Sequence, residues 1–272
     1  MSGVPPSVSL LVSTYNWPQA LELVLESVRG QRVLPREVVI ADDGSRDETR
    51  RVIERLTPGF PVPLVHVWHE DTGFRLAAIR NKGIAATRGD YIVQIDGDIL
   101  LHPAFIAAHV AFARDDSWVQ GSRALLSAAC TARLLDGTQR EASCLNAGIQ
   151  HRQNALYIPW LSRFIRGPRD GMQRVRGAHM AFWRDDLVRV NGYDERIEGW
   201  GREDSELATR LINAGVHRRN LKFSAVAYHL CHTSANFDSV DRNHQRLERT
   251  MHERLVWTEL GLDQYLDREQ FA

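Results

Sequence analysis

The sequence is poor in cysteine, carries no net charge and has no long apolar run, and each of these absences excludes a class of protein. Among 272 residues there are three cysteines, Cys130, Cys144 and Cys231, and they form no CxxC pair. A disulfide framework or a zinc knuckle is therefore not expected, and a reducing compartment is the default. The 34 basic and 34 acidic side chains cancel, so no overall field attracts nucleic acid and no nucleic-acid partner is expected.

No apolar stretch approaches the roughly 18 residues of a membrane span. The first residues lack a basic region, and the apolar run from Val8 to Val12 is too short for a signal peptide. We therefore expect a soluble, cytoplasmic protein. The apolar content of 43% suffices for one sizeable core, or for one domain with a smaller annex.

The first half of the chain alternates short apolar runs with helical patterns. Strands are expected at 8–12, 37–41, 62–67 and 91–95. Helices are expected after the cap Asn16, after a capping box of Ser45 and Glu48, from Leu76 to Ile84, and after Pro103. This alternation predicts an α/β fold, a parallel sheet with helices on both faces.

The second half of the chain is less regular. A helix is expected from Arg202 to Ala214, and residues 240–260 have a charged helical pattern. We interpret residues 1–120 as a nucleotide-binding half, 121–240 as an acceptor-binding and catalytic half, and 241–272 as a helical extension. No repeat or low-complexity linker separates them, so one continuous structural domain is expected.

Polar clusters follow three of the expected strands. They are Ser13-Thr14-Tyr15-Asn16, Asp42-Asp43-Gly44-Ser45 and Asp96-Gly97-Asp98. In a parallel sheet the carboxyl ends of the strands meet at one edge, where ligands bind. Carboxylate oxygens suit Mn²⁺ or Mg²⁺ shared with phosphates, and Gly97 lets the backbone approach a ligand closely. A solvated turn is the alternative for Asp96-Gly97-Asp98 alone, but three clusters in series favour a site.

The remaining candidates each have a structural alternative. Asp42 and Asp43 suit a nucleoside pocket, whereas Ser45 and Asp47 are explained by helix capping. Gly73-Phe74-Arg75, with Arg80 and Asn81, offers guanidinium groups for a phosphate or an ordinary solvated helix face. The histidines of Tyr228-His229-Leu230-Cys231-His232 are either metal ligands or satisfied side chains.

The segment Gly199-Trp200-Gly201-Arg202-Glu203-Asp204 frames a tryptophan between glycines directly before a helix. Such a tryptophan can pack against a sugar ring, and a carboxylate at the helix start can accept a proton from a hydroxyl. The helix macrodipole alone would also place acidic residues there. It does not explain the glycine-framed tryptophan, so we favour a functional interpretation.

Taken in order, these motifs resemble family 2 glycosyltransferases of the GT-A fold. The resemblance rests on the runs 8–16, 40–45 and 96–98. It continues in a carboxyl-terminal module similar to β-1,4-galactosyltransferases and chondroitin-polymerase-like enzymes, with the runs 176–182, 191–195 and 199–204. The resemblance covers about residues 7–235 and implies a Rossmann-like nucleotide-binding sheet continuous with a smaller acceptor-binding part.

The resemblance also implies roles at matching positions. Asp204 would be the general base, with Glu203 beside it, and Asp98 would bind the metal with His229 or His232, His229 being slightly preferred. Trp200, Gly201 and His179 would contact the donor or acceptor sugar. The donor would be held by Thr14, Tyr15, Asn16, Asp42, Asp43, Arg75, Asn81, Asp96, Gly97 and Asp98. Arg202 and Ser205 depart from several relatives, which leaves the donor preference open.

The reaction implied is an inverting transfer from a nucleotide-sugar, with a UDP-sugar favoured and a dTDP-sugar as competitor. The cofactor would be Mn²⁺ or Mg²⁺, and the acceptor a glycan or lipid-linked hydroxyl in bacterial surface polysaccharide or lipopolysaccharide synthesis. One alternative is a nucleotidyltransferase that makes the sugar nucleotide, although the loop 13–16 has no glycine to cradle phosphate. A non-catalytic carbohydrate-binding protein is another.

Residues 157–176 mix aromatic side chains with Arg163, Arg166, Arg169, Arg174 and Arg176. A solvated loop is the favoured interpretation. The alternative is a lid, or peripheral contact with the inner face of the cytoplasmic membrane. The sequence does not indicate an oligomeric state.

Overall fold

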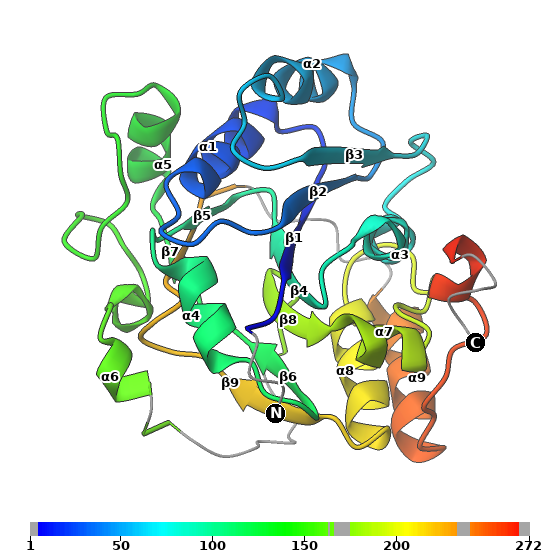
Figure 1. Ribbon diagram of the computed structural model, residues 1–272. Helices are drawn as coiled ribbons and strands as arrows, with labels where there is room; N and C mark the ends of the chain where they lie inside the picture. The colour runs from blue at the N-terminus through cyan, green and yellow to red at the C-terminus, as the bar shows by residue number, and fades with distance from the viewer. Residues whose placement is uncertain (1–4, 163, 166–174, 233–239, 267–272) are drawn as a thin grey trace.

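The computed structural model describes residues 5–162, 164–165, 175–232 and 240–266, which form a central sheet with helices on both faces (Figure 1). The seven strands of this sheet, in spatial order, are β3 (Leu64–Trp68), β2 (Glu37–Asp42), β1 (Val8–Thr14), β4 (Tyr91–Asp96), β8 (His179–Trp183), β6 (Ser117–Gln120) and β9 (His217–Asn220). The first four are parallel, and β8 runs antiparallel to both β4 and β6. The α/β architecture predicted from the alternating pattern is confirmed, with β8 as its antiparallel insertion.

The apolar core occupies both faces of the sheet. All seven residues of β1 are buried, as expected for a central strand covered on both sides. Leu10 and Val12 pack with α1 (Pro18–Arg29), α2 (Asp47–Leu56), α4 (Phe105–Phe112) and α5 (Ala128–Leu135). Leu11 faces the opposite layer of α3 (Leu76–Ala86), α7 (Arg184–Arg189) and α8 (Glu203–Asn213). The two helical layers thus cover both faces of the strands whose ends carry the polar clusters.

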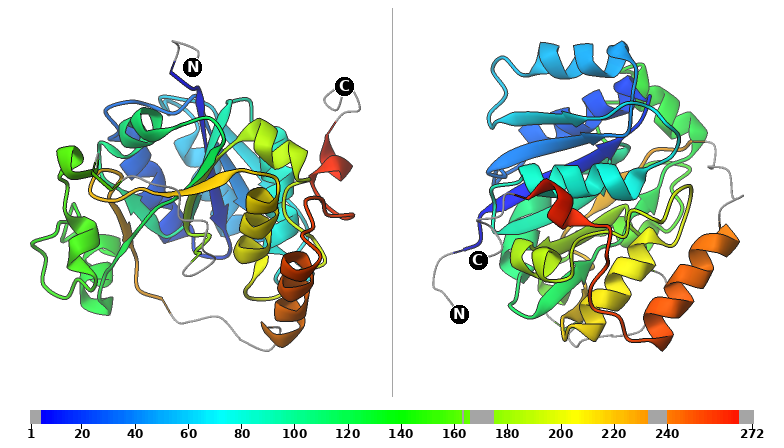
Figure 2. Two further views of the ribbon diagram at one scale, coloured as in Figure 1. Left: turned by 90° about the horizontal axis from the view of Figure 1, so that it is seen from below. Right: turned by 90° about the vertical axis from the view of Figure 1, so that its right-hand side faces the viewer.

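A second, three-stranded sheet consists of β5 (Ile99–Leu101), β10 (Ala227–His229) and β7 (Ala124–Leu125). β10 is antiparallel to β5 and parallel to β7. Short helices are α6 (Pro159–Ser162) and the 3₁₀ turns η1 (Arg152–Ala155) and η2 (Leu262–Tyr265). The last long helix, α9 (Val240–His252), lies beside α8 (Figure 2).

The two predicted helix caps are wrong, because the side chains of Asn16 and Ser45 each accept a hydrogen bond from the other loop. α1 begins after Trp17 and α2 after Arg46, and neither start has a side-chain cap. Instead the Asn16 backbone N–H donates to Ser45 Oγ at 2.8 Å, and the Arg46 N–H donates to Asn16 Oδ1 at 2.9 Å. The loops after β1 and β2 are thus tied to each other.

Two predicted element bounds also differ. The third strand begins at Leu64 rather than Val62. The helix expected over 240–260 ends at His252, where Asn213 of α8 donates to the carbonyls of Thr250 and Leu255 and holds the departing chain. Charge periodicity alone could not reveal this tertiary stop.

Candidate active site

The polar ends of β1, β2 and β4 meet at one edge of the large sheet. Ser13 pairs in register with Asp96, and Thr14 with Asp42. Gly97 packs against this edge so closely that a Cβ would lie 3.0 Å from the Ser13 carbonyl oxygen and from Thr14 Cβ. The sequence expectation that the three polar clusters share an edge is confirmed.

A cavity of about 610 Å³ opens at this edge. It receives side chains from both halves of the chain. The predicted residues in its lining are Thr14, Tyr15, Asp43, Asp96, Gly97, Asp98, Trp200, Gly201, Glu203, Asp204 and His232. The lining also includes residues that the sequence did not single out, among them Trp17 and Arg123.

Asp98, His229 and His232 form a compact group of metal-ligand type. Their ligand atoms all lie within 4.8 Å of one another. Asp98 Oδ2 is 3.4 Å from His229 Nε2 and 3.1 Å from His232 Nε2. The cause is the small sheet, in which His229 pairs with Ile99, the residue after Asp98. The sequence left open which histidine faces Asp98, and the structure brings both to it.

The chemistry of this group fits a divalent cation. Asp98 Oδ1 is buried and accepts no hydrogen bond from the residues that the structure describes. Burial lowers the pKa of His229, against the opposing effect of Asp98, and so favours the neutral imidazole that a metal requires. One carboxylate and two imidazoles suit Mn²⁺ or another borderline cation.

Arg80 of α3 lies at the centre of the acidic part of the cavity. Its side chain is only 1% exposed. Nη1 donates to Asp204 Oδ1 at 2.8 Å, Nη2 donates to Asp96 Oδ1 at 3.1 Å, and Nε donates to Ser13 Oγ at 3.2 Å. The sequence suggested that the Arg80 guanidinium could bind a phosphate. In the structure, its N–H groups instead donate to oxygens of the protein.

Asp204 is fixed from a second side by the backbone before β8. The Gly177 N–H donates to Asp204 Oδ2 at 2.6 Å. A Cβ on residue 177 would lie 2.1 Å from Asp204 Oδ1, so only glycine permits this approach. Because β8 is antiparallel to β4, its first residues reach the same edge as the end of β4.

Glu203 is the third acid beside Arg80, with its Oε1 3.5 Å from Arg80 Nη1. It is buried, and its Oε2 has no hydrogen-bond partner among the described residues. Burial, together with the neighbouring Asp204 and against the opposing Arg80, raises the pKa of Glu203 to about 8. The neutral acid is therefore the favoured form of Glu203 near pH 7.

Asp42 and Asp43 have different environments. Asp43 lines the cavity; its Oδ1 accepts from His69 Nε2 at 2.7 Å and its Oδ2 from the Arg75 backbone N–H at 3.0 Å. Burial raises the pKa of Asp43. Asp42 accepts from the Ser45 N–H and from His66 and is not in the cavity lining. Asp43 is the one placed to meet a ligand.

Besides Asp42 and His229, four predicted site residues lie outside the cavity lining. Asn16 and Arg75 contribute to loop structure, and the Arg75 guanidinium donates to the Glu70 carbonyl. Asn81 is buried, where its amide exchanges hydrogen bonds with the Tyr193 backbone. His179 is also buried: its Nδ1 donates to the Ser122 carbonyl, and its Nε2 lies 2.8 Å from His109 Nε2.

The arginine-rich segment is described only in part. Arg163, Arg166, Arg169 and Arg174 lie outside the described residues, and Arg176 lines the cavity. Among the described helices, none is long and apolar enough to span a membrane.

Comparison with known sequences matches residues 9–134 to glycosyl transferase family 2 and residues 165–233 to the N-terminal domain of galactosyltransferase. Both matches fall in the order that the motifs predicted and confirm the resemblance to family 2 glycosyltransferases. The chain is 24% identical to chondroitin synthase of Escherichia coli, over 82% of the chain and 34% of the relative. It is 27% identical to validoxylamine A glucosyltransferase of Streptomyces hygroscopicus subsp. limoneus, over 78% and 49% respectively. The chain thus spans at most about half the length of these relatives.

Solved structures show the same fold. A Pyrobaculum calidifontis mannosyltransferase in complex with GDP-Man and Mn²⁺ has a TM-score of 0.57 and 21% identity, over 84% of this chain and 57% of that one. Residues 1–349 of Staphylococcus aureus TarS, in complex with UDP-GlcNAc, have a TM-score of 0.61 and 15% identity, over 95% and 69%. The fold is that of GT-A glycosyltransferases.

Proposed function

We propose that this protein is a metal-dependent, inverting glycosyltransferase of family 2, which transfers a sugar from a nucleotide-sugar to a hydroxyl of a glycan or glycolipid. The observation that carries the proposal is one cavity lined by both Asp98 of the candidate metal group and the partly buried acid Asp204. The mannosyltransferase neighbour was solved with Mn²⁺ and a nucleotide-sugar, which supports a comparable donor here.

In the proposed reaction, the acceptor oxygen attacks the anomeric carbon from the face opposite the diphosphate. The bond from carbon to the acceptor oxygen forms as the bond from carbon to the diphosphate oxygen breaks, and Asp204 takes the hydroxyl proton. Asp98, His229 and His232 would hold the cation, which supplies positive charge to the departing diphosphate. Inversion requires one base and no carboxylate nucleophile.

The rest of the cavity is assigned by the same reasoning. Asp43, oriented by His69 and the Arg75 N–H, would accept a hydrogen bond from the base or ribose. Trp200 would pack against a sugar ring. A UDP-sugar is favoured because the TarS neighbour was solved with UDP-GlcNAc, and a dTDP-sugar remains the competitor. A bacterial surface polysaccharide is the proposed pathway.

The binding test is the thermal shift of the purified protein with UDP, dTDP, GDP or CMP, each with and without Mn²⁺. A ligand at about 100 times its dissociation constant adds about 2.7 kcal/mol of stability. We expect a UDP shift that needs Mn²⁺ and disappears in Asp98→Ala. Asp136→Ala, which removes an exposed acid bonded only to Thr138, is the matched control. A shift with dTDP alone would change the donor, and no shift with any nucleotide would contradict the proposal.

The reaction test is slow transfer to water. Proton NMR of the sugar first released from an α-linked UDP-sugar should show the β anomer. The α anomer would contradict inversion. Nucleotide binding without transfer or hydrolysis would support a non-catalytic carbohydrate-binding protein instead, and pyrophosphate formed from a nucleoside triphosphate and a sugar phosphate would support a nucleotidyltransferase.

A further inference from the structure

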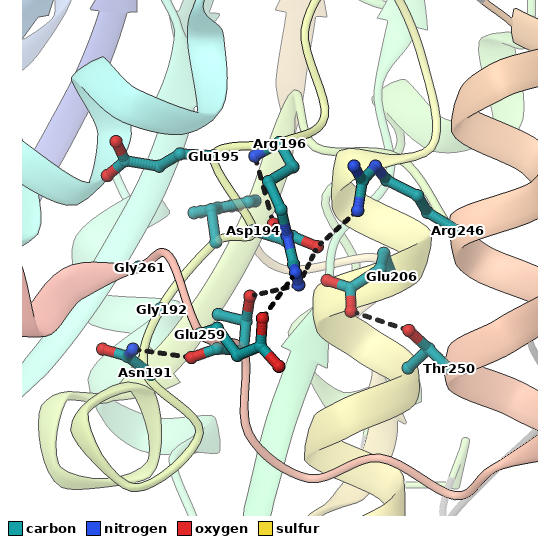
Figure 3. Close-up of polar contacts among 12 residues, drawn as sticks. Asn191, Gly192, Asp194, Glu195, Arg196, Glu206, Arg246, Thr250, Glu259 and Gly261 are labelled. Atoms are coloured by element: carbon teal, nitrogen blue, oxygen red, sulfur yellow. Dashed lines mark hydrogen bonds and ion pairs between the residues drawn. The ribbon is translucent and has the colours of Figure 1, made fainter.

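The loop between α7 and α8, residues 190–202, carries Trp200 into the cavity and is held from behind by residues that follow position 239. Both matched family regions end before these residues, at 134 and 233. At the start of the loop, where Figure 3 labels Asn191, the Asn191 Nδ2 donates to the Thr258 carbonyl and to Asp263 Oδ1, each at 2.8 Å. The later part of the chain thus contributes to the shape of the loop.

A second set of contacts in Figure 3 fixes the middle of the loop. Arg196 forms a two-point ion pair with Asp194, at 2.8 and 3.1 Å, and Nη1 reaches Glu259 at 3.0 Å. Arg246 of α9 approaches Asp194 at 3.9 Å. These ion pairs hold the middle of the loop but do not reach the tryptophan turn.

The tryptophan turn, residues 198–202, is held by Asn243 of α9. Asn243 is fully buried, and its Nδ2 donates to the carbonyls of Glu198 and Gly201, each at 3.0 Å. These two carbonyls flank Gly199 and Trp200. One side-chain amide therefore closes the turn that presents the tryptophan.

The turn needs such a restraint because of its backbone. Gly199, Gly201 and Arg202 have φ values of 72°, 96° and 82°, all in the left-handed region. Glycine visits many backbone conformations, and arginine adopts this one only at a cost in free energy. Among the described residues, the other backbone contact of the turn to a distant element is the Gly199 N–H to the Phe74 carbonyl at 2.9 Å.

The contacts of the Asn243 side chain with the turn require its N–H donors. Both partners are carbonyl oxygens, which only accept hydrogen bonds, so the amide nitrogen must face them. Asn243 Oδ1 is buried and accepts no hydrogen bond from any described residue. A buried acceptor without a partner is unfavourable, and the two bonds to the turn offset that penalty.

We propose that Asn243 is a positioning residue, which fixes Trp200 against the cavity and sets the start of α8 with Glu203 and Asp204. Its kinetic consequence rests on the proposed function, in which Trp200 packs against a sugar. Its structural consequence, the placement of the Trp200 ring, does not depend on that function.

The chain offers a matched control in Asn213. Its Nδ2 also donates to two backbone carbonyls, those of Thr250 and Leu255, at 3.3 and 2.8 Å. Asn213 is not part of the cavity lining. Asn243→Asp and Asn213→Asp each replace the donating amide by a carboxylate of the same shape. In both variants the carboxylate then faces the partial negative charge of two carbonyl oxygens. Asn243→Ala and Asn213→Ala are the milder pair, for use if either aspartate variant does not fold.

The structural readout is ¹⁹F NMR of protein containing 5-fluorotryptophan. The seven tryptophans give separate signals, and Trp200→Phe identifies that of Trp200. We expect the Trp200 signal to shift or broaden in the Asn243 variants and to stay in place in the Asn213 variants. An unchanged Trp200 signal in a folded Asn243 variant would overturn the proposal.

The kinetic readout separates this proposal from the proposed function. With a UDP-sugar as donor, we expect the Asn243 variants to lose about tenfold in kcat/KM, mainly through KM, because two hydrogen bonds that order the turn are lost. The Asn213 variants should keep kcat/KM within about twofold, even with a lower Tm. If the Trp200 signal moves while the wild-type protein has no transferase activity, positioning stands and the proposed function fails.

Discussion

Arg80 Nη1 lies 2.8 Å from Asp204 Oδ1, although the two residues are 124 positions apart in the chain. The other Nη of the same guanidinium contacts Asp96 at 3.1 Å. One buried cation therefore joins the acid that ends β4 to the acid at the second position of α8. The proposed donor and acceptor sides of the cavity share this single residue.

Arg80→Leu should be strongly destabilising, because it leaves Asp96, Glu203 and Asp204 without their shared cation. Removing one partner of a buried ion pair costs about 3–5 kcal/mol. Urea unfolding measures the loss.

Arg80→Lys should retain part of the stability but lose turnover, since an ammonium cannot reproduce the forked hydrogen bonds of the guanidinium. Arg210→Lys, in a buried pair with Glu206 outside the cavity, should lose stability with a smaller effect on turnover; equal turnover losses would contradict the role of Arg80.

Asp204→Asn should lower kcat by about 10²-fold or more, the usual scale for a general base. UDP binding in the thermal-shift assay should persist, since the change removes a proton acceptor rather than the proposed nucleotide contacts. Asp186→Asn on α7, whose carboxylate pairs with Arg189, is the control. Turnover near the wild-type value in Asp204→Asn would remove this residue from its proposed role.

His229→Ala and His232→Ala should each weaken Mn²⁺ binding by about tenfold or more, because both imidazoles face Asp98. Electron paramagnetic resonance of free Mn²⁺ gives the affinity directly, without an activity assay. His244→Ala, on the exposed side of α9, serves as the control. If only one of the two variants loses affinity, the other histidine is not a ligand.

Glu203→Gln should change how stability depends on pH. The pKa of Glu203 is raised to about 8, so the folded protein retains a proton that the unfolded chain loses above its ordinary value near 4.5. The wild-type protein should therefore lose stability relative to Glu203→Gln as pH rises from about 5 to 8, by at most about 1.4 kcal/mol per pH unit. Urea unfolding of both proteins across this range measures the difference. Parallel stability curves would mean that the Glu203 pKa is not raised.

Local patterns were enough to predict the sheet edge of the site. β1, β2 and β4 are buried apolar runs whose ends carry polar residues, and in a parallel sheet such ends must converge. Short strands carry no comparable pattern. β5 and β10 have three residues each, so nothing in the sequence predicted the pairing that brings both His229 and His232 to Asp98.

Side-chain partners were predicted less well than backbone elements. Arg80 lies on a helix whose apolar and polar residues have no clear sidedness, and its three acidic partners come from distant segments. His179 was placed in the sugar site by its position in a motif, but the structure buries it against His109 of α4, 70 positions away. Such contacts depend on how helices cross strands, which local periodicity does not encode.

The antiparallel pairing of β5 with β10 has a consequence for the order of folding. Asp98 and His229 are more than one hundred positions apart in the chain, and contacts between such distant segments form late, after local helices and neighbouring strands. During synthesis, Asp98 would leave the ribosome long before either histidine. If Asp98, His229 and His232 hold a cation as proposed, the affinity would arise only when β10 docks, so binding of the ion would follow the formation of the small sheet rather than nucleate it.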